Sequence, residues 1–455
     1  MLTKGRPPNT IHLTSRTAIT CVGVCGPALV LGAGVAHDPL LAYLVVAVFL
    51  GALGLALAGV DRFTTLVLAA LPWLIVLMGV TPRLTLTLGT TFAVLLLIAS
   101  RPPYSDVSSV SWIGVMLFLL PLLGHVIESA SPEQVIVAAK LSLFPAVVLI
   151  ASSRAARARL LSTRPLLLAS AVGAMATQAA VSILHIGPSG NYYSAGTYSK
   201  AGVALGLTPD APHEMALLGV IVSVACLLTI RDIRWRVTAA AVAATPALAT
   251  GVRSAVVALM LALVLLILKA RLRASMLLTI AAIATVVVFS GVASIVFARF
   301  QQGQAAGEYS SIEAAGSGRG AVEATALRQW LASGLSGVTV GTGLGSVAES
   351  EQRRYGVSVG AQNDPLAVLV ELGVMGVIGW LLLWLALVRA KVNWLVLVPI
   401  ASYSLTNGDM QYVGALVFGI VIAVACSSPR DTTAVSRVAY RPSVRSARVT
   451  AGMRA

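Results

Sequence analysis

Residues 365–388 read PLAVLVELGVMGVIGWLLLWLALV, an apolar run whose one charged residue is Glu371. A helix needs about 20 such residues to cross the hydrocarbon core of a membrane. The run must be helical there, because lipid offers no partner for backbone N–H and C=O groups. This segment therefore predicts a transmembrane helix, and the rest of the chain repeats the pattern.

The composition excludes a soluble domain. Of the 455 residues, 57% are hydrophobic and only 11% are charged, and the mean hydropathy is +0.89. A soluble protein needs more polar surface than this. We predict an all-α polytopic membrane protein with about 12–14 transmembrane helices. The predicted spans are 18–36, 39–60, 63–80, 84–100, 111–127, 134–152, 165–184, 214–230, 237–250, 254–270, 275–297, 365–388, 393–405 and 412–426.

The basic residues predict the orientation. The net charge is +15 and the pI is near 10.3, but the cations lie in short clusters between the spans, so we expect lipid headgroups and not nucleic acid as their partner. With residues 1–17 in the cytoplasm, alternation puts most of the 32 Lys and Arg residues inside. The predicted membrane domain covers 18–426, and residues 427–455 form a basic, disordered cytoplasmic tail. The excess of Arg over Lys and the abundance of Ala and Val are associated with high-GC bacteria, so we expect the chain in a bacterial cytoplasmic (inner) membrane.

Two long loops, 185–213 and 298–364, fall on the outer side. In the second, the segment 322–335 predicts a short amphipathic helix that lies on the outer membrane surface or under a lid. Its apolar face holds Leu327, Trp330, Leu331 and Leu335. A glycine turn ending in Arg319 precedes it, and the run Gly341–Gly345 follows it. Such a run could let backbone approach a ligand closely, but a lone glycine-rich run is weak evidence and a tight turn between two helices explains it better.

Two outer-side arginines are the candidate catalytic cations. Arg253 interrupts apolar sequence where the orientation rule asks for no cation, so we expect it to face a cavity or to snorkel to the interface. Arg319 lies in the large loop. A guanidinium makes bidentate, permanently charged hydrogen bonds that suit a diphosphate.

The chain resembles the O-antigen ligase and O-antigen polymerase superfamily, membrane glycosyltransferases that use polyprenyl-diphosphate-linked glycans outside the cytoplasmic membrane. The resemblance covers about residues 200–390. The matching elements, in order, are Pro212-His-Glu-Met-Ala216, Gly251-Val-Arg253-Ser-Ala255, Ser317-Gly-Arg319 with Trp330, the run Gly341–Gly345, and Asn363, Leu366, Glu371, Gly373 and Gly376. The resemblance implies polymerisation or ligation of a lipid-linked glycan in assembly of the cell envelope or an exopolysaccharide.

Gln362 departs from the family pattern. The family's ligases have a histidine there, proposed to act as general base, and a glutamine accepts no proton at neutral pH. Three explanations stay open. Another outer-side group is the base, and the candidates are Asp364, Glu349, Glu351 and His213. Or the diphosphate leaves without much base assistance. Or the chain is a diverged member without this activity.

We therefore assign Arg253, Arg319, Gln362 and Asp364 to catalysis. Substrate binding is assigned to Lys200, His213, Glu214, Arg328, Asn363 and Glu371. No spacing of His, Asp or Glu suggests a metal, and no cofactor is expected. The expected partners are a lipid-linked glycan donor, a glycan or lipid acceptor, membrane lipids and other proteins of envelope polysaccharide assembly. Two rivals remain: a lipid-linked glycan flippase or transporter, and a non-catalytic assembly scaffold.

Overall fold

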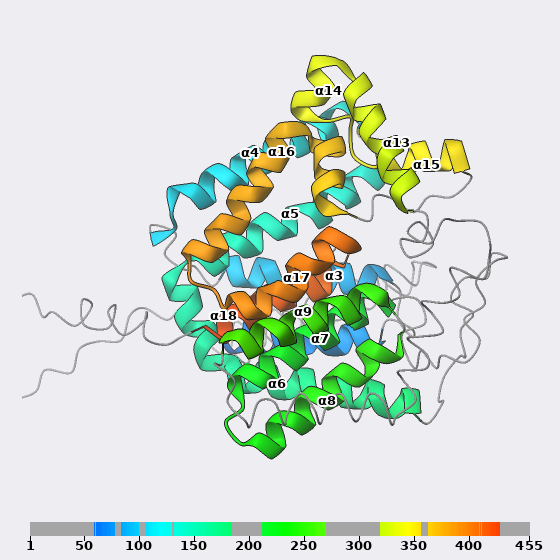
Figure 1. Ribbon diagram of the computed structural model, residues 1–455. Coiled ribbons are helices and arrows are strands. Elements are labelled where there is room, and N and C mark those ends of the chain that lie inside the picture. The colour runs from blue at the N-terminus through cyan, green and yellow to red at the C-terminus, as the bar shows by residue number, and fades with distance from the viewer. Residues whose placement is uncertain are drawn as a thin grey trace, which may run out of the picture. The chain divides into compact units, whose positions relative to one another are not determined.

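The computed structural model describes residues 61–77, 83–99, 106–129, 132–183, 212–250, 252–269, 319–355, 363–408 and 412–427, together with Gly59 and Met410. The chain divides into two compact units, residues 1–67 and 68–455, and the description below concerns the second. Within the described residues every regular element is a helix (Figure 1). The predicted spans 18–36, 39–60 and 275–297 and the basic tail lie outside the described residues.

Four described helices are long and apolar enough to cross a membrane: Ser109–Glu128, Gln134–Ser152, Arg154–Val181 and Asp364–Arg389. Shorter apolar helices lie at Gly89–Ile98, His213–Thr229, Trp394–Thr406 and Val413–Ala425. The protein is therefore an all-α, membrane-embedded protein. The elements of the membrane part are α3 (Arg83–Ala99), α4 (Ser109–Ser129), α5 (Pro132–Ser152), α6 (Arg154–Ile183), α7 (Pro212–Thr229), α8 (Ile233–Ala249), α9 (Arg253–Lys269), α16 (Asp364–Arg389), α17 (Trp394–Thr406) and α18 (Val413–Ala425).

Polar side chains cap the N-termini of several helices. The side chain of Asn363 accepts a hydrogen bond from the Leu366 amide, and Pro365 follows in the first turn of α16. Asp232 caps α8 by accepting from the amides of Arg234 and Trp235, and Asn393 caps α17 through the amide of Leu395. Such caps satisfy amide groups that the helix itself leaves without a partner.

α6 corrects one predicted boundary. We expected a span beginning at Pro165 after a basic cytoplasmic segment, but the helix begins at Arg154 and continues through Pro165. The basic segment is helical because arginine and alanine are good helix formers and because the segment contains no residues that favour a turn. Proline inside the helix is tolerated because neighbouring helices and side chains satisfy the freed backbone groups.

Small residues let the helices approach closely. α4 and α16 run side by side, and a Cβ atom added at Gly379 would lie 2.6 Å from the Phe118 amide nitrogen (Figure 1). On α7, a Cβ at Gly219 would lie 2.7 Å from the Ala243 carbonyl oxygen of α8. Backbones in contact at small residues are typical of helix packing in membranes, where dispersion forces dominate.

The helices share a basic end. Polar contacts join the start of α4 to the end of α5 (Ser111 and Ser152 hydroxyls, 3.2 Å), and the start of α6 to the end of α16 (Arg157 to the Ala390 carbonyl). The start of α17 meets the end of α18, where the side-chain nitrogen of Asn393 donates to the Cys426 carbonyl at 2.9 Å. The cations on these termini and on the α7–α8 connection are Arg154, Arg157, Arg159, Arg231, Arg234, Arg236, Lys269, Arg389 and Lys391.

The predicted amphipathic helix is two helices. α13 (Arg319–Ala332) and α14 (Gly334–Val340) are separated at Gly334, whose φ of +74° ends the first, and α15 (Ser346–Tyr355) follows. Leu327, Leu331 and Leu335 are exposed, as a membrane-facing stripe requires. Trp330 does not share their face: it packs against the buried cluster of Ala326, Val347 and Val370. The predicted single face is therefore divided within α13: Leu327 and Leu331 lie on its exposed side, whereas Trp330 turns toward α16.

Candidate functional site

The ends of several helices meet opposite the basic end. α7, α16 and α18 begin here and α17 ends here. α9 begins here too, because it packs along α17 and because the Lys269 ammonium at its far end lies 5.4 Å from the centre of the Trp394 ring. That contact makes the two helices antiparallel, so Arg253 lies toward the end of α17. Its side chain is half-buried.

His213, near the start of α7, is held on several sides. The Asn407 side-chain nitrogen lies 3.0 Å from Nδ1 of the ring. The ring of Tyr412 stacks on the imidazole at 5.7 Å between centroids and 21° between planes. The Tyr403 hydroxyl donates to the backbone carbonyl of His213 at 3.3 Å. Three residues of the segment Tyr403–Tyr412 thus fix one histidine.

Glu214 lies beside it and has a different partner. Its side chain is 5% exposed, and its carboxylate accepts a hydrogen bond from the Ala415 amide at 3.0 Å. Tyr412, the residue before α18, makes no side-chain cap. Glu214 therefore supplies the missing cap from another helix, where the positive end of the α18 dipole favours a carboxylate.

Asp364 and Asn363 join the start of α16 to the end of α17. The Asp364 carboxylate is 2% exposed and accepts from the Ser404 hydroxyl at 2.7 Å and from the Met410 amide at 3.3 Å. The Asn363 side chain donates to the Leu405 carbonyl at 3.2 Å. Asp364 and His213 thus both bind to the short segment between α17 and α18.

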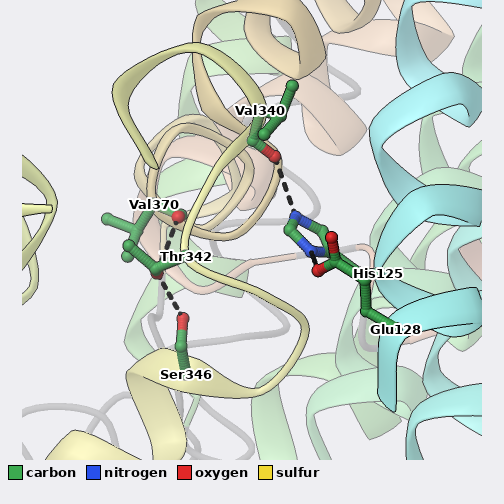
Figure 2. Close-up of polar contacts among 6 residues, drawn as sticks. All are labelled: His125, Glu128, Val340, Thr342, Ser346 and Val370. Atoms are coloured by element: carbon green, nitrogen blue, oxygen red, sulfur yellow. Dashed lines mark hydrogen bonds and ion pairs between the residues drawn. The ribbon is translucent and has the colours of Figure 1, made fainter. Parts of the chain in front are cut away.

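α16 is broken at Gly373, whose φ of 68° and ψ of −169° are not helical. Figure 1 shows the two pieces meeting at an angle beside α14. The glycine run Gly341–Gly345 fills the break. The Thr342 amide and hydroxyl both donate to the Val370 carbonyl, at 2.8 and 2.9 Å, and the hydroxyl also contacts that of Ser346 at 2.7 Å (Figure 2).

The closeness of these two backbones requires glycine on both sides. A Cβ at Gly341 would lie 2.1 Å from the Glu371 carbonyl oxygen, and one at Gly373 would lie 2.4 Å from the Thr339 carbonyl oxygen. Gly341 has a φ of 93°, which only glycine adopts readily. The glycine run of the resemblance is therefore a docking element between the loop helices and α16.

His125 secures the same element from α4. Its Nε2 lies 2.8 Å from the Val340 carbonyl oxygen, so Nε2 carries the proton, and its Nδ1 lies 3.8 Å from a Glu128 carboxylate oxygen (Figure 2). Glu371, two residues before the break, is partly buried and accepts from the Gly345 backbone amide. Both side chains thus face the docked glycine run.

The remaining predicted residues have these positions. Arg319 is the first residue of α13, and Arg328 is exposed on the same helix, which packs against α16. Glu349 pairs with Arg353 at 3.0 Å on the surface of α15. Lys200 and Gln362 lie outside the described residues. Among the described residues, no group of three His, Cys, Asp or Glu side chains has the geometry to hold a metal ion.

The fold thus sorts the predicted site into two groups. Arg253, His213, Glu214, Asn363 and Asp364 gather where α7, α9, α16, α17 and α18 meet. Arg319, Arg328 and Glu371 belong to the loop helices and to the break in α16 against which they pack. The two groups are linked through α16, which begins in the first and is broken in the second.

Sequence reasoning missed Asn407, Tyr403 and Tyr412, which surround His213. They lie in the segment Tyr403–Tyr412, which interrupts two apolar runs with Ser, Thr, Asn, Gly and Asp. The concentration of polar residues between two short predicted spans could have pointed to these residues, because a polar group next to lipid needs a partner. His125 of α4 was also missed, and its Nε2 contacts the Val340 carbonyl oxygen of the loop.

No protein-family model matches the chain, and no curated protein sequence matches it significantly.

Proposed function

We propose that this protein transfers a glycan from a polyprenyl diphosphate to an acceptor hydroxyl, as a polymerase or ligase of cell-envelope or exopolysaccharide synthesis. The observation that carries the proposal is the gathering of Arg253, His213, Asn363 and Asp364 at one end of the helices, opposite the basic end. These residues come from segments far apart in the chain.

The proposed topology follows from the distribution of charge. The basic end faces the cytoplasm of a bacterium, in agreement with the positive-inside rule, and both termini lie on that side. The end that holds His213 and Arg253 then faces outward, where lipid-linked glycans are assembled. The loop helices α13–α15 lie on the same side, with Leu331 and Leu335 toward the membrane surface.

In the proposed reaction the bond between the anomeric carbon and the diphosphate oxygen breaks, and its electron pair leaves with the polyprenyl diphosphate. The acceptor oxygen forms the new glycosidic bond, and its proton passes to solvent water as the diphosphate leaves without much base assistance. Arg253 and Arg319 stabilise the negative charge that develops on the diphosphate. The protein's residues supply binding, orientation and charge, and the reaction needs no redox step.

Alanine variants of the two arginines test the proposal. Arg253→Ala and Arg319→Ala should each lower the rate of polyprenyl diphosphate release by about 10²–10³-fold, the usual loss for one group that stabilises developing charge. Arg234→Ala, an exposed cation of the basic end, is the matched control and should keep its rate. The assay uses purified full-length protein in liposomes with a polyprenyl-diphosphate oligosaccharide. Normal rates in both variants would rule out the mechanism.

The break in α16 favours a second candidate, a lipid-linked glycan flippase. Discontinuous helices commonly form substrate sites in transporters, because their free ends interact with charged groups. The same liposomes distinguish the two: a flippase moves the donor between leaflets without releasing polyprenyl diphosphate, whereas the proposed transferase releases it. Protein that does neither supports the scaffold.

A further inference from the structure

We infer that Asn407 is a positioning residue that holds His213 with its ring proton on Nε2, so that His213 serves the site as a hydrogen-bond donor and not as a proton acceptor. The donor role rests on the proposed function. The position of the proton does not, because it follows from the contacts of Asn407.

The first step is the direction of the hydrogen bond. The Asn407 side-chain nitrogen, 3.0 Å from Nδ1 of His213, is an amide nitrogen and can only donate. Nδ1 must therefore accept, which means that it carries no proton. In a neutral imidazole the proton then resides on Nε2.

The second step is that the surroundings hold this arrangement. The Asn407 side-chain nitrogen also donates to the Tyr412 hydroxyl oxygen at 3.1 Å, and Tyr412 stacks on the histidine ring. Asn407 is 2% exposed and Tyr403, which binds the His213 carbonyl, is fully buried. Neither ring nor amide can turn without breaking several contacts, so the geometry is pre-organised.

The third step is the chemical consequence. A ring with its proton on Nε2 donates to an anionic oxygen, such as one of a diphosphate, and cannot take the proton of an acceptor hydroxyl through that nitrogen. The lone pair on Nδ1 is already engaged by Asn407. His213 is thereby removed from the candidate general bases and joins Arg253 as a group that binds negative charge.

Charged and titratable groups on every neighbouring element bear on the protonation of His213. They are Glu214 on α7, Arg253 on α9, Asp364 on α16, Tyr403 on α17 and Tyr412 before α18. Of these, Glu214 and Asp364 accept hydrogen bonds from the Ala415 and Met410 backbone amides. The effect of pH on His213 must therefore be measured as the activity of a variant relative to native protein over the same pH range, because the pH profile of one protein alone does not isolate His213.

The first test is independent of activity. Full-length protein in lipid nanodiscs, labelled with ¹⁵N-histidine, should show Nε2 of His213 protonated and Nδ1 unprotonated at neutral pH, with the signal assigned by its loss in His213→Gln. In Asn407→Leu the two ring nitrogens should exchange protons freely. A proton on Nδ1 in the native protein would overturn the inference, whether or not the protein transfers a glycan.

The second test uses the transfer assay. His213→Gln, which keeps an N–H donor at the position of Nε2, should retain activity within about tenfold, while His213→Leu should lose about 10²–10³-fold. Equal loss in both variants would overturn the donor role. No release of polyprenyl diphosphate by native protein would instead refute the proposed function and leave the NMR result standing.

Asn407→Asp supplies a readout that a purely structural role would not change. The introduced carboxylate accepts the proton of Nδ1, so the neutral ring loses the proton on Nε2. When the ring takes up a second proton at lower pH, both nitrogens carry protons and the donor returns. Relative to native protein, the variant's activity should rise at least tenfold from pH 8 to pH 6. A constant ratio would overturn the inference.

Discussion

Replacing Gly341 by alanine is expected to detach the loop helices α13–α15 from α16. Gly341 lies at the start of the glycine run that docks into the break of α16, with a φ of 93°. A Cβ there would lie 2.1 Å from the Glu371 carbonyl oxygen and 2.5 Å from the Leu372 amide nitrogen. Both are backbone atoms, so no side chain can move aside.

Two effects weaken the docking of the loop helices in Gly341→Ala. A non-glycine residue in this backbone region costs about 1–3 kcal/mol. Overlap in a packed interior costs about 1–3 kcal/mol more. We expect docking to weaken by about 3 kcal/mol, which is roughly a 100-fold change in the equilibrium between docked and open states. The loss is confined to the loop helices, because they can open without unfolding the membrane helices.

Gly345→Ala is the matched control. Gly345 is in the same run with a φ of 77°, but a Cβ there meets nothing within 4 Å. Only backbone strain of about 1 kcal/mol remains, a change of roughly fivefold. Amide hydrogen exchange of α13–α15, measured on full-length protein in nanodiscs, reports the opening directly. Equal exchange in the two variants would refute the close backbone contact at the break.

Two further predictions concern stability, measured as unfolding midpoints in one detergent. Asp364→Ala leaves the Ser404 hydroxyl and the Met410 amide without their acceptor. We expect the free energy of unfolding to fall by about 3 kcal/mol, against about 1 kcal/mol for Ser404→Ala. Similar losses in the two variants would contradict the shared role of the carboxylate. Glu214→Leu removes the cap of α18 and should cost about 2 kcal/mol, whereas Glu214→Gln keeps an acceptor for the Ala415 amide and should cost less than half of that. Identical midpoints for the two Glu214 variants would show that the cap does not stabilise α18.

The sequence predicted the membrane helices well where the apolar runs are long. The spans 111–127, 134–152 and 365–388 correspond to α4, α5 and α16 within a few residues, because hydrocarbon demands a helix of set length. The prediction was less accurate in the large loop. There the periodicity of 322–335 could not show that Gly334 breaks the helix, since glycine is tolerated inside helices as well as at their ends.

The candidate site was predictable in its residue types but not in its partners. Arg253 stood out because a cation that interrupts apolar sequence is costly, whereas His213 and Asp364 were selected as outer-side titratable groups able to act as a base. Nothing in the chain indicated that Asn407 would reach His213, or that Glu214 would cap α18, because residues about 190–200 positions apart meet only through packing. Those contacts decide which groups can bind a ligand and which stabilise the helices.

The apolar run at residues 365–388 therefore determined by itself that this chain forms helices in a membrane, because the solvent leaves backbone groups no other solution. The clustering of Lys and Arg between the runs likewise predicted which helix ends share a side. Only the tertiary structure decided that this same run is broken at Gly373 and receives the glycine run of a distant loop. A break in lipid leaves backbone groups without partners, so it forms only where another segment supplies them, as Thr342 does for the Val370 carbonyl.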